Sequence, residues 1–222
     1  LILHMRILSM KTKYICNCKK FDFSSKNYVY WENRETTSDE VDIINFIKKK
    51  IDLKNKVVLH LGIGNSEIAK IFRDARKIIG ITISNKEIQR ANNLKLENYN
   101  VFLLDKYSIN FCEFISNFKF DYIVDTNLKS YSCCQDSFNY MFSTLNKILL
   151  TEGKIITSRK GMNWYKKLKP KLSFNFKQFF HFKLKEINGD KLNILSINEL
   201  EKFCDYNKLK LTYDERVLYL SK

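Results

Sequence analysis

The run Val57-Val58-Leu59-His60-Leu61-Gly62-Ile63-Gly64-Asn65-Ser66 decides the fold of this chain. Residues 56–61 form a short apolar stretch that stops at a glycine, which is typical of a strand buried on both faces in a parallel sheet. Because Gly62 and Gly64 have no Cβ, the backbone can turn sharply there and lie against a ligand. We expect a helix over residues 66–73 whose first N–H groups face that ligand. Open α/β sheets bind cofactors at this position, beyond the carboxyl ends of the strands.

On either side of this run, apolar strands alternate with amphipathic helices. The expected strands are 56–61, 77–83, 100–104, 120–124 and 154–158, and the expected helices are 66–73, 85–96 and 135–150. Thr151-Glu152-Gly153 is expected to turn the chain into the last of these strands. A capping box, Thr37 with Glu40, predicts an earlier helix with an apolar stripe at Val41, Ile44, Ile47 and Ile51. This alternation predicts a doubly wound parallel sheet.

The C-terminal part follows a different pattern. Ser196 and Glu199 form a second capping box, which opens a helix to about residue 207. Two strands, 208–213 and 216–221, are then separated only by Asp214-Glu215, so they must pair antiparallel. The predicted fold is therefore α/β, with a mostly parallel seven-stranded sheet that ends in an antiparallel hairpin. Residues 1–36 are predicted to be an irregular extension, and 37–222 a single domain with a basic, aromatic insert at about 159–195.

Bulk composition indicates an ordinary globular protein with a basic surface. The chain has 222 residues, 45% of them hydrophobic and 28% charged, and a formal net charge of +15. Such a charge favours an anionic partner, but solvated lysines of a chain rich in AT-encoded residues would give the same number. No apolar run is long enough to span a bilayer, and no clear signal peptide opens the sequence, so we expect a cytoplasmic protein.

Six cysteines occur, at positions 16, 18, 112, 133, 134 and 204. In a cytoplasm these are expected to be reduced thiols. Neither Cys16-Asn17-Cys18 nor Cys133-Cys134 has the spacing of a zinc-type CxxC pair, so the sequence predicts no metal site.

A basic segment follows the fifth predicted strand. Residues 159–185 contain nine lysines and arginines and no acid, with tryptophan, tyrosine and phenylalanine interleaved. Such a segment can grip phosphates and stack on nucleic-acid bases, or lie on an anionic membrane surface. Equally, its phenylalanines can fill a core beneath solvated lysines.

The order of these motifs resembles that of the class I S-adenosylmethionine-dependent methyltransferases. Residues 57–66 are similar to the first motif of that superfamily, 120–125 to its fourth, and 148–154 to the turn before its fifth strand. The resemblance runs from about residue 30 to the C-terminus, with a gap at about 160–195. Gly64-Asn65-Ser66 and the upstream Tyr30-Trp31-Glu32-Asn33-Arg34 also resemble the methyltransferase-like branch that includes elongation-factor lysine methyltransferases.

The resemblance implies S-adenosylmethionine as cofactor and assigns its contacts. The methionine part would lie along Gly62, Ile63, Gly64, Asn65 and Ser66. The adenine would lie at Asp105, which accepts a hydrogen bond from the adenine amino group, with Lys106 and Tyr107 flanking the ring. Asp125 would lie near the methyl-transfer site. Asp105 has a structural alternative as a helix cap. No residue is singled out as the catalytic base.

Two positions depart from the superfamily pattern. His60 stands where an acid is usual, and packing against the sheet is its simpler interpretation. At the end of the second strand, Gly80-Ile81-Thr82-Ile83-Ser84-Asn85-Lys86-Glu87 lacks the acid that holds the ribose hydroxyls. It resembles a variant seen in cyclopropane-fatty-acid synthases and their relatives. We expect Thr82 and Glu87 together, beside Ile83, to replace that carboxylate.

Three functions compete on this evidence. The first is methyl transfer to an unidentified acceptor, which could be a protein lysine, an anionic small molecule, a sugar or a nucleic acid. The second is a catalytically degenerate domain that binds nucleic acid or a partner protein through its basic face. The third, a nicotinamide-dependent dehydrogenase, is disfavoured by the missing third glycine, the missing ribose acid and the antiparallel C-terminal hairpin.

Overall fold

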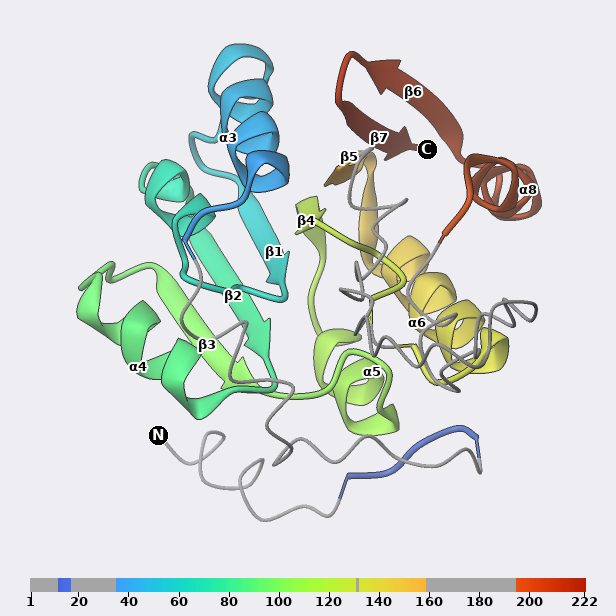
Figure 1. Ribbon diagram of the computed structural model, residues 1–222, viewed down its shortest axis with the longest axis horizontal. Coiled ribbons are helices and arrows are strands. Elements are labelled where there is room, and N and C mark those ends of the chain that lie inside the picture. Colours follow the sequence, from blue (N-terminus) through green and yellow to red (C-terminus); the bar gives the residue numbers. More distant parts are fainter. Residues whose placement is uncertain (1–11, 17–34, 131, 159–194) are drawn as a thin grey trace, which may run out of the picture.

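The computed structural model describes residues 12–16, 35–130, 132–158 and 195–222, and shows a central seven-stranded sheet (Figure 1). Its strands, in chain order, are β1 (Val57–Leu61), β2 (Lys77–Thr82), β3 (Tyr99–Leu103), β4 (Phe120–Asp125), β5 (Leu149–Ser158), β6 (Lys210–Asp214) and β7 (Val217–Ser221). They are arranged in the order β3-β2-β1-β4-β5-β7-β6. The predicted fold class is confirmed.

Strands β1 to β5 pair in parallel, and β7 joins antiparallel to both β5 and β6. The chain order reverses at β1, which pairs with β2 on one side and β4 on the other. The carboxyl ends of these strands therefore form one continuous edge, on which Leu61 pairs with both Ile81 and Asp125. A crevice for ligands is expected at such a reversal.

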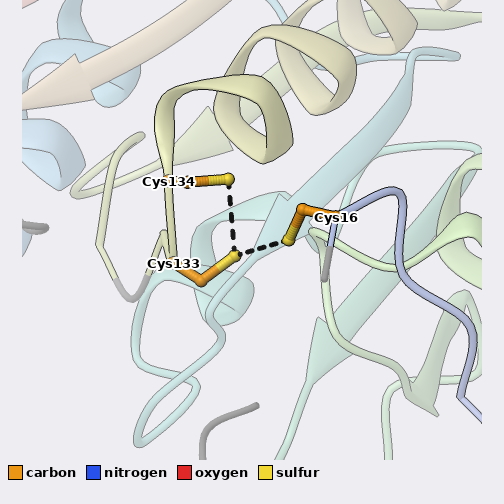
Figure 2. Close-up of side chains that lie close together, drawn as sticks. All are labelled: Cys16, Cys133 and Cys134. Carbon is orange, nitrogen blue, oxygen red and sulfur yellow. Dashed lines mark hydrogen bonds between the residues drawn. The ribbon is translucent and has the colours of Figure 1, made fainter. Parts of the chain in front are cut away.

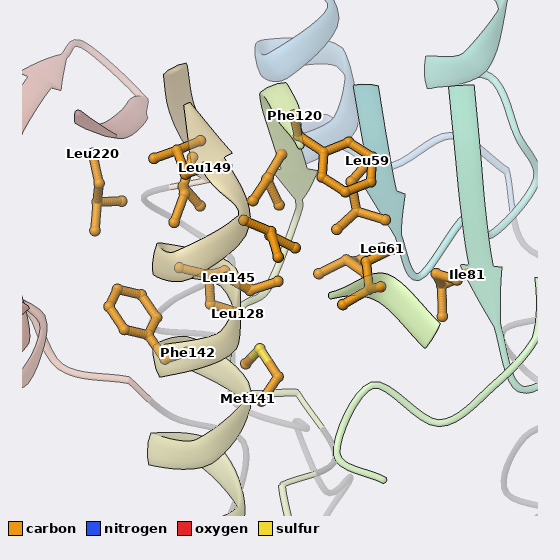
Figure 3. Close-up of a cluster of buried hydrophobic side chains, with 14 of the residues drawn as sticks. Leu59, Leu61, Ile81, Phe120, Leu128, Met141, Phe142, Leu145, Leu149 and Leu220 are labelled. Atoms are coloured by element: carbon orange, nitrogen blue, oxygen red, sulfur yellow. The ribbon is translucent and has the colours of Figure 1, made fainter. Parts of the chain in front are cut away.

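Helices cover both faces of the sheet. One face carries α3 (Ser38–Lys50), the 3₁₀ helix η2 (Ile68–Phe72) and α4 (Asn85–Asn93), and the other carries α5 (Ile109–Ile115), α6 (Gln135–Ile148) and α8 (Ile197–Asn207). Figure 3 shows the larger core beneath α6, where Met141, Phe142 and Leu145 lie among strand residues such as Leu59 and Leu61. Alternate β1 residues serve the two faces, as Val58 belongs to the smaller core under α3.

The predicted capping box of α3 is present, but its apolar stripe was partly wrong. The Thr37 side chain accepts from the Glu40 N–H, and Glu40 accepts from the Thr37 N–H at 2.8 Å. Val41, predicted to be part of the stripe, is 42% exposed, whereas Ile43 and Phe46 are buried. The apolar face of α3 that packs in the core is therefore formed by Ile43, Phe46 and Ile47.

Several further elements differ from the sequence-based expectations, and α4, for example, ends at Asn93 rather than at residue 96. No helix starts at Ser66, because its φ of +64° is left-handed and cannot belong to a right-handed helix; the short 3₁₀ turn η2 stands there instead. Residues 151–153 lie inside β5, which begins directly after α6. Gly153 is needed there because a Cβ would lie 2.9 Å from the Leu150 carbonyl oxygen and 3.0 Å from the Asp121 carbonyl oxygen. Helix α5, capped by Ser108, was not predicted.

The C-terminal hairpin was predicted correctly, with Glu215 and Arg216 rather than Asp214 and Glu215 between its strands. Within the described ranges, no helix is long and apolar enough to cross a membrane. The predicted extension, apart from residues 12–16, 35 and 36, and nearly all of the predicted insert fall outside the described residues.

Candidate functional site

The loop after β1 presents its backbone to open space. Gly62, Gly64 and Ser66 all have left-handed φ angles, of +62°, +53° and +64°. The Gly62 N–H donates to the Ile81 carbonyl at 2.9 Å, which ties the loop to the end of β2. A Cβ built at Gly62 would meet no heavy atom within 4 Å. The space beside Gly62 is therefore open, so a ligand could lie against the backbone at this position.

The rest of this loop is held by its own side chains. Asn65 donates through Nδ2 to the Thr36 hydroxyl at 2.9 Å and accepts the Glu67 N–H through Oδ1 at 3.2 Å. Ile63 is buried against Ala91 of α4. The Ser66 N–H donates to the Ile63 carbonyl at 2.8 Å. These contacts fix the loop conformation, so any role of Ile63, Asn65 and Ser66 in binding would come through the backbone that they hold.

The end of β2 carries a buried hydroxyl–carboxylate pair. Thr82 donates from Oγ1 to Glu87 Oε2 at 2.5 Å, and the two residues are 4% and 7% exposed. The Ser84 N–H donates to the Thr82 hydroxyl at 3.1 Å, and Ser84 caps α4 by accepting from the Glu87 N–H. The half-buried Ile83 lies between them. The structure therefore brings together Thr82 and Glu87, the two residues expected to replace the missing acid.

Asp105 follows β3 and is engaged in a tight turn. Its Oδ1 accepts the Tyr107 N–H at 2.9 Å. The alternative that Asp105 caps a helix is wrong, because Ser108 is the residue that caps α5. Burial raises the pKa of Asp105, while hydrogen bonds from the Tyr107 backbone and the Tyr14 side chain lower it. The Asp105 carboxyl group is therefore largely buried after the end of β3, where Tyr107 and Tyr14 donate hydrogen bonds to it.

Residues 12–16 form a strap beside this turn. The Lys13 carbonyl accepts the Ile109 N–H at 2.8 Å, and the Lys13 N–H donates to Asn110 Oδ1 at 2.7 Å. Tyr14 forms an antiparallel bridge with Ser108. A segment far away in the sequence thus lies against the turn that carries Asp105. Its aromatic and polar composition gave no sign of this position.

Lys106 lies next to Asp105 in the chain, but its side chain points away from the predicted adenine position. Its ammonium donates to Asp125 Oδ2 at 2.7 Å, to the carbonyls of Asn127 and Leu128 at 3.0 and 3.1 Å, and to Ser130 Oγ at 3.2 Å. Lys106 therefore braces the loop after β4. Sequence reasoning named both Lys106 and Asp125 but missed that they form a pair.

Asp125 and Tyr107 are also satisfied within the protein. The second carboxylate oxygen of Asp125 accepts the Asn127 N–H at 3.0 Å. Burial raises the pKa of Asp125, and the Lys106 ammonium opposes that rise. Tyr107 is 3% exposed and donates to the Leu128 and Ser130 carbonyls at 3.0 and 2.9 Å. Both side chains hold the β4 loop in place through these hydrogen bonds.

His60 is packed inside the sheet, as its simpler interpretation expected. It is 1% exposed, and its ring lies edge-on to Phe72 at 6.0 Å and stacks with Tyr99 at 6.5 Å between centroids. Burial lowers its pKa to about 4, with the buried Glu40 carboxylate acting in the opposite direction. His60 is therefore neutral at physiological pH and faces the α3 side of the sheet.

The absence of a metal site stays a prediction, but the structure brings together three cysteines that could hold a metal ion. Cys16 of the strap and Cys133-Cys134 before α6 place their sulfur atoms within 4.8 Å of one another (Figure 2). Local CxxC spacing could not indicate this group, because Cys16 and Cys133 are 117 positions apart. Cys18 lies outside the described residues.

Comparison with known proteins places the fold. No protein-family model matches the sequence, and no curated protein matches it. Several solved structures, however, are similar to this chain. Magnesium protoporphyrin IX methyltransferase from Synechocystis, with bound SAM, has a TM-score of 0.56 at 13% identity over 90% of this chain and 93% of that one. The N-methyltransferase NodS from Bradyrhizobium japonicum, in complex with S-adenosyl-L-homocysteine, has 0.56 at 10% identity, with coverages of 90% and 92%.

A TehB-like SAM-dependent methyltransferase from Corynebacterium glutamicum has a TM-score of 0.52 at 10% identity, covering 89% of this chain and 93% of that one. The described structure and these likenesses show the class I methyltransferase fold.

Proposed function

We propose that this chain binds S-adenosylmethionine at the carboxyl edge of β1, β2 and β3 and transfers its methyl group to an acceptor. The observation that carries the proposal is the pairing of an open, left-handed glycine loop with a buried hydroxyl–carboxylate pair on the next strand. Gly62 offers the space, and Thr82 with Glu87 offers the polar contact. Fold alone would not decide this, because one fold hosts many functions.

The residues present fit the cofactor part by part. The loop at 62–66 would receive the methionine portion against its backbone. Glu87, with several acceptor positions on its carboxylate, would accept from the ribose hydroxyls. Because Thr82 donates its proton to Glu87, its role would be to orient that carboxylate. Asp105 would receive the adenine amino group, with the backbone of Lys106 and Tyr107 beside it and their side chains holding the β4 loop.

When bound, S-adenosylmethionine supplies a methyl group on a sulfonium, which an acceptor atom attacks in line. The protein's own contribution is to align that acceptor with the methyl group and to exclude water. Lys106 and Asp125 serve this by fixing the loop after β4, next to the end of β1. Two structures of the same fold carry SAM or its product SAH, which supports this choice of cofactor.

The acceptor, a small molecule or a protein group, is proposed to be held by the basic segment at 159–185. That segment follows β5, whose last residue, Ser158, lies on the same carboxyl edge as the candidate site. An anionic acceptor or carrier, including nucleic acid or an anionic membrane surface, would suit its charge. Reversing Lys166, Lys167 and Lys169 to Glu should weaken such binding and reduce its salt dependence while leaving the melting temperature nearly unchanged.

The test of the proposed function is binding of S-adenosylhomocysteine to the purified chain. Calorimetric titration should give micromolar affinity, and the ligand should raise the melting temperature, because it binds only the folded state. Adenosine and NAD⁺ serve as controls for the adenosine portion and for dehydrogenase binding. A chain that binds none of them would be a degenerate domain of this fold.

A further inference from the structure

Three thiols from two distant segments meet at the start of α6 (Figure 2). Cys16 Sγ lies 3.2 Å from Cys133 Sγ, and Cys133 Sγ lies 3.8 Å from Cys134 Sγ. All three sulfur atoms are within 4.8 Å of one another, and all three residues are partly buried. The two other free cysteines of the described ranges, Cys112 and Cys204, are buried in the core and belong to no such group.

These distances suit a single metal ion. Tetrahedral zinc with Zn–S bonds of about 2.3 Å holds its sulfur ligands about 3.8 Å apart. The Cys133–Cys134 distance matches this value, the Cys16–Cys133 distance is shorter and a small rotation of either side chain would open it, and the Cys16–Cys134 distance is at most 4.8 Å. Three protein ligands leave the fourth tetrahedral position for a water molecule. Thiolates prefer Zn²⁺ and other soft cations over Mg²⁺ or Ca²⁺, which take oxygen ligands.

Neighbouring groups support negative sulfur atoms at this place. The buried Ser137 hydroxyl lies 3.0 Å from Cys133 Sγ and 3.2 Å from Cys16 Sγ, so it can donate to a thiolate. Hydrogen bonds of this kind orient metal ligands. Cys134 is the N-cap of the 14-residue helix α6, whose positive end favours a thiolate.

A metal ion binds thiolates rather than thiols, so metal binding by these cysteines would release protons and weaken as the pH falls.

We propose that Cys16, Cys133 and Cys134 form a binding site for one thiophilic divalent cation of the Zn²⁺ class. Three S–H bonds lose their protons to solvent and three metal–sulfur bonds form, with no change of oxidation state. The site ties the strap at 12–16 to the N-terminus of α6. Because Tyr14 of the strap hydrogen-bonds to Asp105, the ion also secures one wall of the candidate cofactor site. The proposal does not rest on methyl transfer, since metal binding is measured without cofactor.

The test is titration of the reduced, metal-free full chain with Zn²⁺ and Co²⁺. We expect about one ion per chain, and for Co²⁺ an intense sulfur-to-metal charge-transfer band with tetrahedral ligand-field bands. Cys16→Ala and Cys133→Ala should each lose at least tenfold in affinity. The matched control, Cys204→Ala, removes a buried thiol elsewhere and should bind as the unmodified chain does.

A second measurement covers the case in which a variant fails to fold. In the unmodified chain, Zn²⁺ should protect Cys16 from alkylation, read by peptide mass spectrometry, and leave the labelling of Cys204 unchanged. No charge-transfer band, or equal Co²⁺ binding by Cys133→Ala, would overturn the proposal. The proposal would also be overturned if the reduced chain bound neither Zn²⁺ nor Co²⁺ and instead formed a Cys16–Cys133 disulfide in air.

Discussion

The Thr82 hydroxyl donates to the Glu87 carboxylate at 2.5 Å, and together they stand where the superfamily pattern has a single acid. Glu87→Ala should therefore weaken S-adenosylhomocysteine binding by about tenfold or more, since a hydrogen bond to a charged group contributes roughly 1.5–3 kcal/mol. Isothermal titration calorimetry measures the loss. Glu113→Ala, at an exposed position of α5, is the control and should bind normally. Normal binding by Glu87→Ala would reduce Glu87 to a favourable first-turn charge of α4.

The hydrogen bond between Thr82 and Glu87 also determines the effect of placing an acid at position 82. In Thr82→Asp a second carboxylate would face Glu87 at hydrogen-bonding distance, and two buried like charges repel. We expect the single variant to lose stability in urea unfolding and to bind cofactor more weakly. The double variant Thr82→Asp with Glu87→Gln replaces that repulsion by an amide–carboxylate hydrogen bond and should recover both. Tighter binding by the single variant would contradict this account.

Gly62 should be needed for binding more than for folding. Gly62→Val should abolish S-adenosylhomocysteine binding, because its side chain enters the open space above the loop. The left-handed φ should cost about 1–2 kcal/mol of stability. Gly80→Ala is the contrasting variant, since its Cβ would lie 2.7 Å from the Tyr99 ring. It should lower the melting temperature more and leave the affinity of the folded protein unchanged; the reverse pattern would misplace the site.

Removal of the buried Lys106 ammonium should strongly lower the free energy of unfolding. Lys106→Met leaves Asp125 buried without its cation and should cost about 3–5 kcal/mol of unfolding free energy. Lys56→Met removes a more exposed partner, at the Lys56–Asp121 pair, and should cost at most about 1 kcal/mol. Adding Asp125→Asn to Lys106→Met should recover part of the loss in urea unfolding. Equal costs for the two lysines would show that the Lys106 pair is not a buried one.

His60 should make the fold acid-sensitive. Its folded pKa of about 4 lies below the ordinary value of 6.5, so the unfolded chain binds the proton more readily. Stability is then full above about pH 6.5 and falls as the pH drops toward 4, by on the order of 3 kcal/mol. Unfolding free energies of the unmodified chain and His60→Gln across this range should converge as the pH falls. Parallel curves would mean that another group is responsible.

The sequence predicted those parts of the molecule that depend on local pattern. The buried run at 57–61 and Gly62 and Gly64 together set the central strand and the loop after it. The hairpin followed from two apolar strands with only two residues between them. The N-cap residues Thr37 and Ser196 marked two helix starts, because a cap depends on four neighbouring residues, although the full capping box is present only at Thr37.

What failed depends on contacts between distant residues or on backbone angles. The left-handed angle at Ser66 shortened the expected helix, and serine gives no sign of it in the sequence. Helix α5 is only seven residues long, too short for a clear periodic pattern. The Lys106–Asp125 pair and the three-cysteine cluster join separate segments, so no spacing rule could reveal them. Ser108, three residues before Phe111, was the one available signal for α5.

The central position of β1 also has a kinetic consequence. The pairing of β1 with β4 joins Leu61 to Asp125, and the pairing of β5 with β7 joins Lys154 to Ser221. The two residues of each pair are more than sixty positions apart in the sequence. The chain loses conformational entropy in closing such long loops before the strand pairs can form, so folding is slow. Until the strands pair, the apolar edges of β1 and β4 are bare and can capture other chains. Refolding yield should therefore fall as protein concentration rises, even under conditions in which the native state is stable.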